Sequence, residues 1–128
     1  MSDLVNADIP QDVAYRQLQE RATHVAARLR EMANDRRLLI LCHLAKLDAL
    51  GEGGEASVGE LQAVVGLSQS ALSQHLARLR AAGMVATRRD AQTIHYRLAD
   101  DETRRLMAAL YETFCSGDGV PSPEETLQ

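Results

Sequence analysis

The chain has 128 residues, of which 45% are hydrophobic and 25% are charged, as in a single compact globular domain. It has no apolar run of about 18 residues and no secretory signal pattern, so we expect a cytoplasmic protein without a membrane partner. One Phe and no Trp disfavour a surface that stacks the bases of single-stranded nucleic acid.

The net charge of −4 at first argues against a DNA partner, but the charges are unevenly distributed. Residues 68–98 carry five arginines against one aspartate, a local balance of +4, which leaves −8 for the rest of the chain. Phosphate attraction depends on the local field, so a basic patch on an acidic body is compatible with DNA binding. A scattered set of solvated arginines is the alternative.

The first part of the chain predicts two helices. Residues 1–10 are expected to form a flexible arm that ends at Pro10, and residues 11–32 a helix. Apolar residues repeat along that helix in steps of 3 and 4, the spacing of a helix that packs on another helix: Leu18, Ala22, Val25, Leu29 and Met32. Asn34 is suited to cap a second helix, whose apolar stretch 38–45 belongs in the core. A glycine-rich loop, residues 51–55, follows it.

Residues 57–83 predict two short helices joined by a turn. Ser57 and Glu60 match a capping box, and Gly66 supplies a left-handed residue that ends the first of these helices. Leu61, Val64 and Val65 should form its buried stripe. Ser68 should cap the second helix, which ends at Gly83 and buries three leucines at helical spacing: Leu72, Leu76 and Leu79.

The last part predicts a hairpin and a final helix. Strands are expected over 84–89 and 93–98, joined at a tip formed by residues 88–92. Asp100 or Asp101 should cap a helix that carries Leu106, Leu110 and Phe114. The fold class is therefore mainly α with a small β-hairpin wing, in the order α-α-α-α-β-β-α. We expect one domain over residues 11–116 and a disordered tail over 117–128.

Two short helices with a glycine-containing turn, followed by a basic hairpin, make a winged helix-turn-helix. The second helix presents small polar side chains at the end that would enter the major groove, where Gln can pair with adenine and Arg with guanine. The expected DNA-binding residues are Ser68, Gln69, Ser70, Ser73, Gln74, His75, Arg78, Arg88, Arg89 and Gln92. A winged helix that binds only proteins remains an alternative.

Three segments, residues 34–44, 67–80 and 87–96, resemble the ArsR/SmtB family of dimeric repressors. The run Leu-Ser-Gln-Ser-Ala-Leu-Ser-Gln-His-Leu over 67–76 carries most of the resemblance. Within that family the chain is similar to the BigR/SqrR/HlyU group, whose members keep one cysteine on the second helix and one on the last. The resemblance implies a homodimer that binds a near-palindromic operator of double-stranded DNA. The loop over 48–56 looks longer than usual in that group.

Cys42 and Cys115 lie at the two cysteine positions of that group, 73 residues apart in sequence. The resemblance implies that the repressor releases DNA when the two thiols are oxidised or bridged by sulfur. Without it, two cysteines on apolar helices are more often buried small hydrophobes. The basic pair Arg36 and Arg37 and the neighbouring His43 suggest a lowered thiol pKa at Cys42. We expect reactive sulfur species, rather than hydrogen peroxide, to be the preferred inducer.

Metal sensing and catalysis are the competing functions. Many members of the family bind metals, but the segment 60–64 has no cysteine and the last helix has no histidine, so no metal site is predicted. Only Cys42, Cys115 and perhaps His43 could supply soft ligands. A thiol oxidoreductase would need a CxxC pair or a cysteine with a positioned base, and neither is visible. We therefore expect neither an enzyme nor a bound cofactor.

Overall fold

The computed structural model describes residues 11–51 and 54–115, and these divide between two compact units with a boundary after Ala33. Three segments lie outside the described residues: the expected N-terminal arm 1–10, residues 52–53 of the glycine-rich loop and the expected tail 117–128. None of the described helices is long and apolar enough to cross a membrane. A single domain over 11–116 stays a prediction, because the first helix belongs to a unit of its own.

The first unit contains helix α1, Gln11–Met32, with the bounds that the sequence predicts. Its side chains at 3- and 4-residue spacing form an exposed apolar stripe along one face. Leu18 is 63% exposed, Val25 48% and Leu29 47%. We call Tyr15, Leu18, Val25 and Leu29 the α1 stripe. Such a stripe is suited to packing against another helix.

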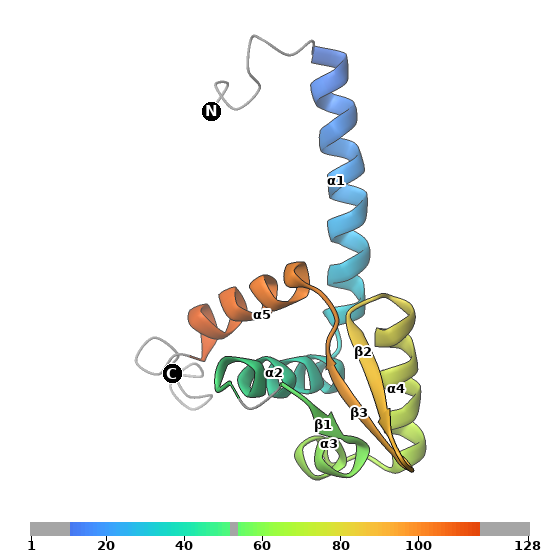
Figure 1. The fold of residues 1–128 in the computed structure, drawn as a ribbon. Helices are drawn as coiled ribbons and strands as arrows, with labels where there is room; N and C mark the ends of the chain where they lie inside the picture. Colours follow the sequence, from blue (N-terminus) through green and yellow to red (C-terminus); the bar gives the residue numbers. More distant parts are fainter. Residues whose placement is uncertain (1–10, 52–53, 116–128) are drawn as a thin grey trace, which may run out of the picture. The chain divides into compact units, whose positions relative to one another are not determined.

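The second unit contains all the remaining elements (Figure 1). Their order is α2 (Asp35–Ala49), β1 (Ala56–Ser57), α3 (Val58–Val65), α4 (Gln69–Ala81), β2 (Val85–Asp90), β3 (Thr93–Leu98) and α5 (Asp101–Phe114). The strands form an antiparallel sheet in the order β1-β3-β2, so the hairpin of β2 and β3 gains a third strand. This confirms the winged helix-turn-helix and adds β1, which the sequence analysis missed.

Local capping explains where the helices begin. Asn34 Oδ1 accepts hydrogen bonds from the backbone of Arg36 and Arg37. The Ser57–Glu60 capping box is present in both directions, and the Ser68 hydroxyl accepts from Ala71 N. Asp100, rather than Asp101, caps α5. These side chains satisfy backbone N–H groups that have no partner within the helix.

The core of the second unit lies where α2 meets the three other helices and the sheet. Ile40, Leu41 and Leu44 of α2 are fully buried, as are the three leucines that α4 was predicted to bury. The core also contains Ala56, Leu61, Val65, Met84, Val85, Leu98 and Met107. One prediction was wrong: Val64 is 44% exposed, because only Leu61 and Val65 of the short α3 face inward. Asp48 and Ala49 also belong to α2 rather than to the following loop.

Candidate functional site

The turn between α3 and α4 has the geometry of a helix-turn-helix. Gly66 adopts φ 74°, and its backbone N–H donates to Gln62 O, so the glycine ends α3 in the left-handed conformation. Leu67 and Ser68 follow, and Ser68 opens α4. Glycine is favoured at this position because a side chain makes positive φ costly. The sequence therefore determines the angle at which α4 leaves α3.

The outward face of α4 carries the polar side chains that the sequence assigned to DNA. Gln69, Ser70, Ser73, Gln74 and Arg78 are all exposed. The predicted residues with a structural role are Ser68, which caps the helix, and His75, which is half-buried with Nδ1 3.4 Å from Arg37 Nη1. These exposed residues lie on the side of α4 away from its three buried leucines.

The wing brings a second set of predicted residues to the surface. Arg89 and Gln92 are exposed near the hairpin turn, where Ala91 adopts φ 57°. Arg88 is exposed as well, but Nε lies 3.0 and 3.1 Å from the two Glu55 carboxylate oxygens, and Nη2 lies 2.8 Å from Oε1. This pairing lowers the pKa of Glu55 and raises the pKa of Arg88. Arg88 is therefore held by a carboxylate just before β1, a contact the sequence analysis did not predict.

Two arginines at the start of α2 contact the two helices of the helix-turn-helix. Arg36 Nη1 donates to Val65 O, at the end of α3, over 2.8 Å. The neighbouring Arg37 is only 7% exposed, and its guanidinium contacts His75 of α4. Both helices of the turn are thus connected to α2 by side chains.

Cys42 and Cys115 are both free thiols, in different surroundings. Cys42 is half-buried on α2, whereas Cys115 is exposed at the C-cap of α5, and the two helices contact each other. The pKa of Cys42 is raised, first by burial and then by the charge of Cys115. The expectation of a lowered pKa at Cys42 was wrong. Arg36 and Arg37 point their guanidinium groups at α3 and α4 instead, and burial disfavours a thiolate.

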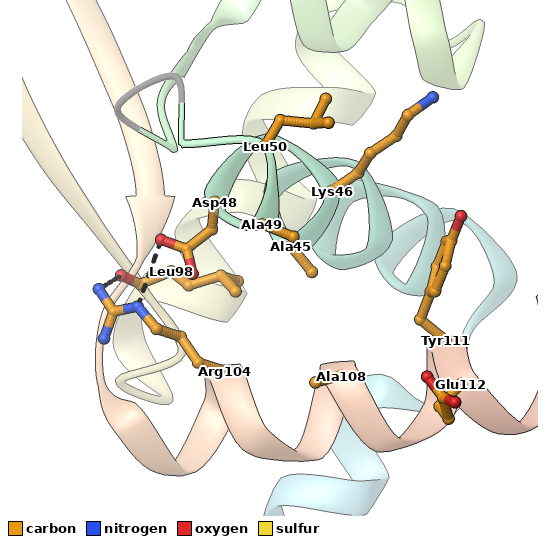
Figure 2. A pocket seen from close by; sticks show the side chains of 10 residues that line it. All are labelled: Ala45, Lys46, Asp48, Ala49, Leu50, Leu98, Arg104, Ala108, Tyr111 and Glu112. Carbon is orange, nitrogen blue, oxygen red and sulfur yellow. Dashed lines mark hydrogen bonds and ion pairs between the residues drawn. The ribbon is translucent and has the colours of Figure 1, made fainter. Parts of the chain in front are cut away.

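A cavity of about 350 Å³ lies between α2 and α5. Figure 2 shows Arg104 and Asp48 pointing toward each other at one end, Tyr111 and Glu112 at the other, and small alanine side chains between them. Arg104 Nε is 3.6 Å from Asp48 Oδ1, and its Nη2 donates to Leu98 O over 3.2 Å. The sequence analysis did not find this cavity, because it depends on the antiparallel packing of two helices far apart in the chain.

Across residues 11–51 and 54–115, no three His, Cys, Asp or Glu side chains gather in an arrangement that could hold a metal ion. The pKa of Glu60 is lowered, first by its capping hydrogen bonds with Ser57 and to a smaller extent by the nearby His43 and His95.

Comparison with known proteins shows which family has this arrangement. Residues 34–87 match the family described as bacterial regulatory protein, arsR family. The biofilm growth-associated repressor of Agrobacterium fabrum is 46% identical over 110 residues, which cover 86% of this chain and 83% of that protein. The chain belongs to the arsR family.

Solved structures of arsR-type regulators agree with the fold described above. Reduced HlyU from Vibrio cholerae superimposes with a TM-score of 0.71 at 44% identity, over 79% of this arsR-family chain and 99% of that one. A winged helix-turn-helix domain from Mycobacterium bovis, described as homodimeric, gives a TM-score of 0.59 at 28% identity over 83% and 87% of the two chains. This arsR-family protein is a transcription regulator, not an enzyme.

Proposed function

We propose that this protein is a homodimeric repressor that binds a near-palindromic DNA operator while Cys42 and Cys115 are reduced. It releases the operator when reactive sulfur species bridge the two thiols. The observation that carries the sensing step is the packing of α2 on α5, since each helix contributes one thiol and the charge of Cys115 affects Cys42. The repressor role is supported by the relative from Agrobacterium fabrum that carries that name.

The DNA-binding step rests on the exposed polar face of α4 and on the wing. Gln74 and Arg78 have the side chains that pair with adenine and guanine edges in the major groove. The serines and Arg89 are suited to phosphate contacts, and Gln92 to the adjacent backbone or groove. Dimerisation would place two such faces about 34 Å apart, as consecutive half-sites require. The α1 stripe and the exposed Phe114 of α5 are apolar surfaces available for that dimer.

The operator contacts are tested by substituting single residues on α4. Gln74→Ala and Arg78→Ala should each lower affinity for the operator by about 1–3 kcal/mol and relax the preference at one base-pair position. Binding to mismatched sites, measured by fluorescence anisotropy, should change little. An unchanged sequence preference in both variants would favour a protein-binding winged helix instead.

The sensing chemistry begins at the exposed thiol. Cys115 loses its proton to solvent, and its thiolate attacks the terminal sulfur of a persulfide donor, R–S–SH. The donor's S–S bond breaks, RS⁻ leaves with the electron pair, and Cys115 becomes a persulfide. A second donor converts Cys42 in the same way. The deprotonated persulfide of one cysteine then attacks the inner sulfur of the other, expels HS⁻ and leaves a bridge of three sulfur atoms.

Intact-protein mass after treatment of the reduced protein with glutathione persulfide or hydrogen peroxide tests this function. We expect the persulfide to add whole sulfur atoms to the monomer, to remove both thiols from alkylation and to release the operator. Cys42→Ser and Cys115→Ser should each prevent the bridge. A peroxide that produced the same loss of DNA binding would contradict the preference for sulfur, and unmodified thiols in unfolded protein would mean that both cysteines are inert.

A further inference from the structure

Arg37 is a buried cation that reaches from α2 to α4. Its side chain belongs to a residue that is only 7% exposed, and its backbone N–H donates to Asn34 Oδ1 over 3.1 Å in the first turn of α2. Nη1 of Arg37 lies 3.4 Å from Nδ1 of His75, which is 38 residues further along the chain. Because the cap fixes its backbone and the surrounding packing restricts its side chain, the guanidinium is held in one position relative to α4.

The chemistry of this contact determines which ring nitrogen of His75 carries the hydrogen. An arginine guanidinium has only N–H donors and no acceptor. In this hydrogen bond Nδ1 of His75 must therefore be the acceptor, so it carries no hydrogen. The hydrogen of the neutral imidazole then lies on Nε2, which makes Nε2–H a hydrogen-bond donor.

His75 lies at the border of the exposed polar face of α4. Its side chain is half-buried, whereas Gln74 and Arg78 are exposed. His75 and Arg78 are three positions apart, so they are neighbours on the helix surface. Because Nδ1 is directed at α2, Nε2 lies on the far side of the ring from that contact. The border of a helix in the major groove is close to the sugar–phosphate backbone, whose oxygens accept hydrogen bonds.

We propose that Arg37 is a positioning residue for DNA binding: it holds His75 in the Nε2–H form, and His75 donates from Nε2 to a phosphate oxygen of duplex DNA. This contact involves no cation of the protein, so it adds affinity without adding salt dependence. It also reads no base. The inference rests on the proposed DNA-binding role of α4 and gives a part in it to Arg37, a buried residue of another helix.

Heteronuclear NMR of the nitrogen-labelled, full-length protein tests the role of Arg37 without DNA. At a pH at which imidazoles are neutral, long-range hydrogen–nitrogen correlations distinguish a protonated from an unprotonated ring nitrogen, and the spectrum of His75→Gln assigns the His75 signals. We expect the Nε2–H form alone in the wild type. Arg37→Lys keeps a donor-only cation and should retain that form. Arg37→Gln offers an acceptor as well as a donor, so it should populate both neutral forms.

A matched variant separates the contact from the loss of charge. Arg36→Gln removes an equal charge one residue earlier, where the guanidinium donates to Val65 O, and should leave the His75 signals unchanged. A hydrogen on Nδ1 of His75 in the wild type would overturn the assignment. An undiminished Nε2–H form in Arg37→Gln, or the same mixture in Arg37→Lys, would overturn it as well.

Fluorescence anisotropy with nonspecific duplex DNA tests the phosphate contact. The amide nitrogen of glutamine can take the place of Nε2, and that of asparagine the place of Nδ1. We therefore expect His75→Gln to keep the affinity within about twofold and His75→Asn to lower it about fivefold, the effect of one neutral hydrogen bond. The slope of log affinity against log salt should be the same in both, because neither substitution removes a cation. Equal effects of the two substitutions on affinity, or a flattened slope, would overturn the phosphate contact.

A double-mutant cycle connects the two residues. Arg37→Gln should weaken DNA binding more in the wild-type background than in His75→Gln, which has no ring hydrogen to direct. Equal weakening in the two backgrounds would show that Arg37 does not act through His75. A wild type that fails to bind duplex DNA would overturn the proposed function, whereas the NMR result would still decide which nitrogen of His75 carries the hydrogen.

Discussion

Of the two cysteines, the half-buried Cys42 is the one whose thiol the fold makes less reactive. Burial and the charge of Cys115 both favour its protonated form, so at neutral pH its thiolate fraction is smaller than that of an ordinary cysteine. The exposed Cys115 is free of the burial that protects Cys42. We therefore expect Cys115 to react with a donor before Cys42 does.

Alkylation with iodoacetamide across pH measures this difference. Because its pKa is raised, Cys42 should react more slowly than Cys115 near pH 8 and speed up as the pH rises above the usual cysteine range. Cys115→Ser removes one of the two causes and should move the Cys42 midpoint partway down, since burial remains. A Cys42 that reacts as fast as a cysteine in the unfolded chain would contradict the assignment.

Arg88 is an exposed cation whose charge is offset by Glu55. Glu55→Gln should release Arg88 for a phosphate contact, and the slope of log affinity against log salt should steepen by about 0.9. Glu20→Gln on α1 changes the net charge equally and should leave the slope unchanged. Equal steepening in both variants, measured on nonspecific duplex DNA, would indicate a general charge effect.

Interactions between residues that are close in the sequence were predictable from the sequence alone. The caps at Asn34, Ser57 and Ser68 and the left-handed Gly66 were identified correctly, because each depends on a backbone group two to four positions away. The Glu55–Arg88 pair joins residues 33 positions apart, and no local pattern indicates it. The same reason hid the two-residue strand β1, whose ladder partner is β3.

Among the elements, α3 is the shortest helix and depends most on its ends. Gly66→Ala should destabilise the protein by about 1 kcal/mol, because φ 74° is costly for a residue with a Cβ even though nothing lies within 4 Å of that atom. Gly59→Ala lies inside the same helix without a close contact and should stabilise by about 0.5 kcal/mol. Urea unfolding of the two variants measures both, and equal shifts would contradict the strain at Gly66.

The packing of α2 on α5 shows the limit of pattern analysis for whole elements. Apolar periodicity and capping residues predicted both helices, although α2 continues through Asp48 and Ala49, which the sequence analysis placed in the following loop. They did not predict that the antiparallel contact of the two helices leaves a cavity with Asp48 and Arg104 at one end. Such a space depends on which helix faces meet and on the small size of Ala45 and Ala108, and helical spacing specifies neither.

For the molecule as a whole, the α1 stripe is apolar surface that the described chain leaves in solvent. Leu29→Asp should shift sedimentation from dimer to monomer and weaken operator binding more than tenfold, since one half-site contact is lost with the partner. Ala27→Asp adds the same charge on the opposite side of α1 and should remain dimeric. A dimeric Leu29→Asp protein would exclude the stripe from the interface.

The arginines at the start of α2 have a consequence for how a signal would reach DNA. Because Arg36 donates to the end of α3 and Arg37 contacts α4, a displacement of α2 would move both helices of the helix-turn-helix with it. Each half-site would still be recognised by an undistorted surface, while the separation between the two surfaces of a dimer changed. Induction would then change the spacing between the two DNA-binding surfaces and leave the base preference of each surface intact. The affinity for an operator with one base pair inserted or removed at its centre would therefore respond to the inducer differently from the affinity for the natural operator.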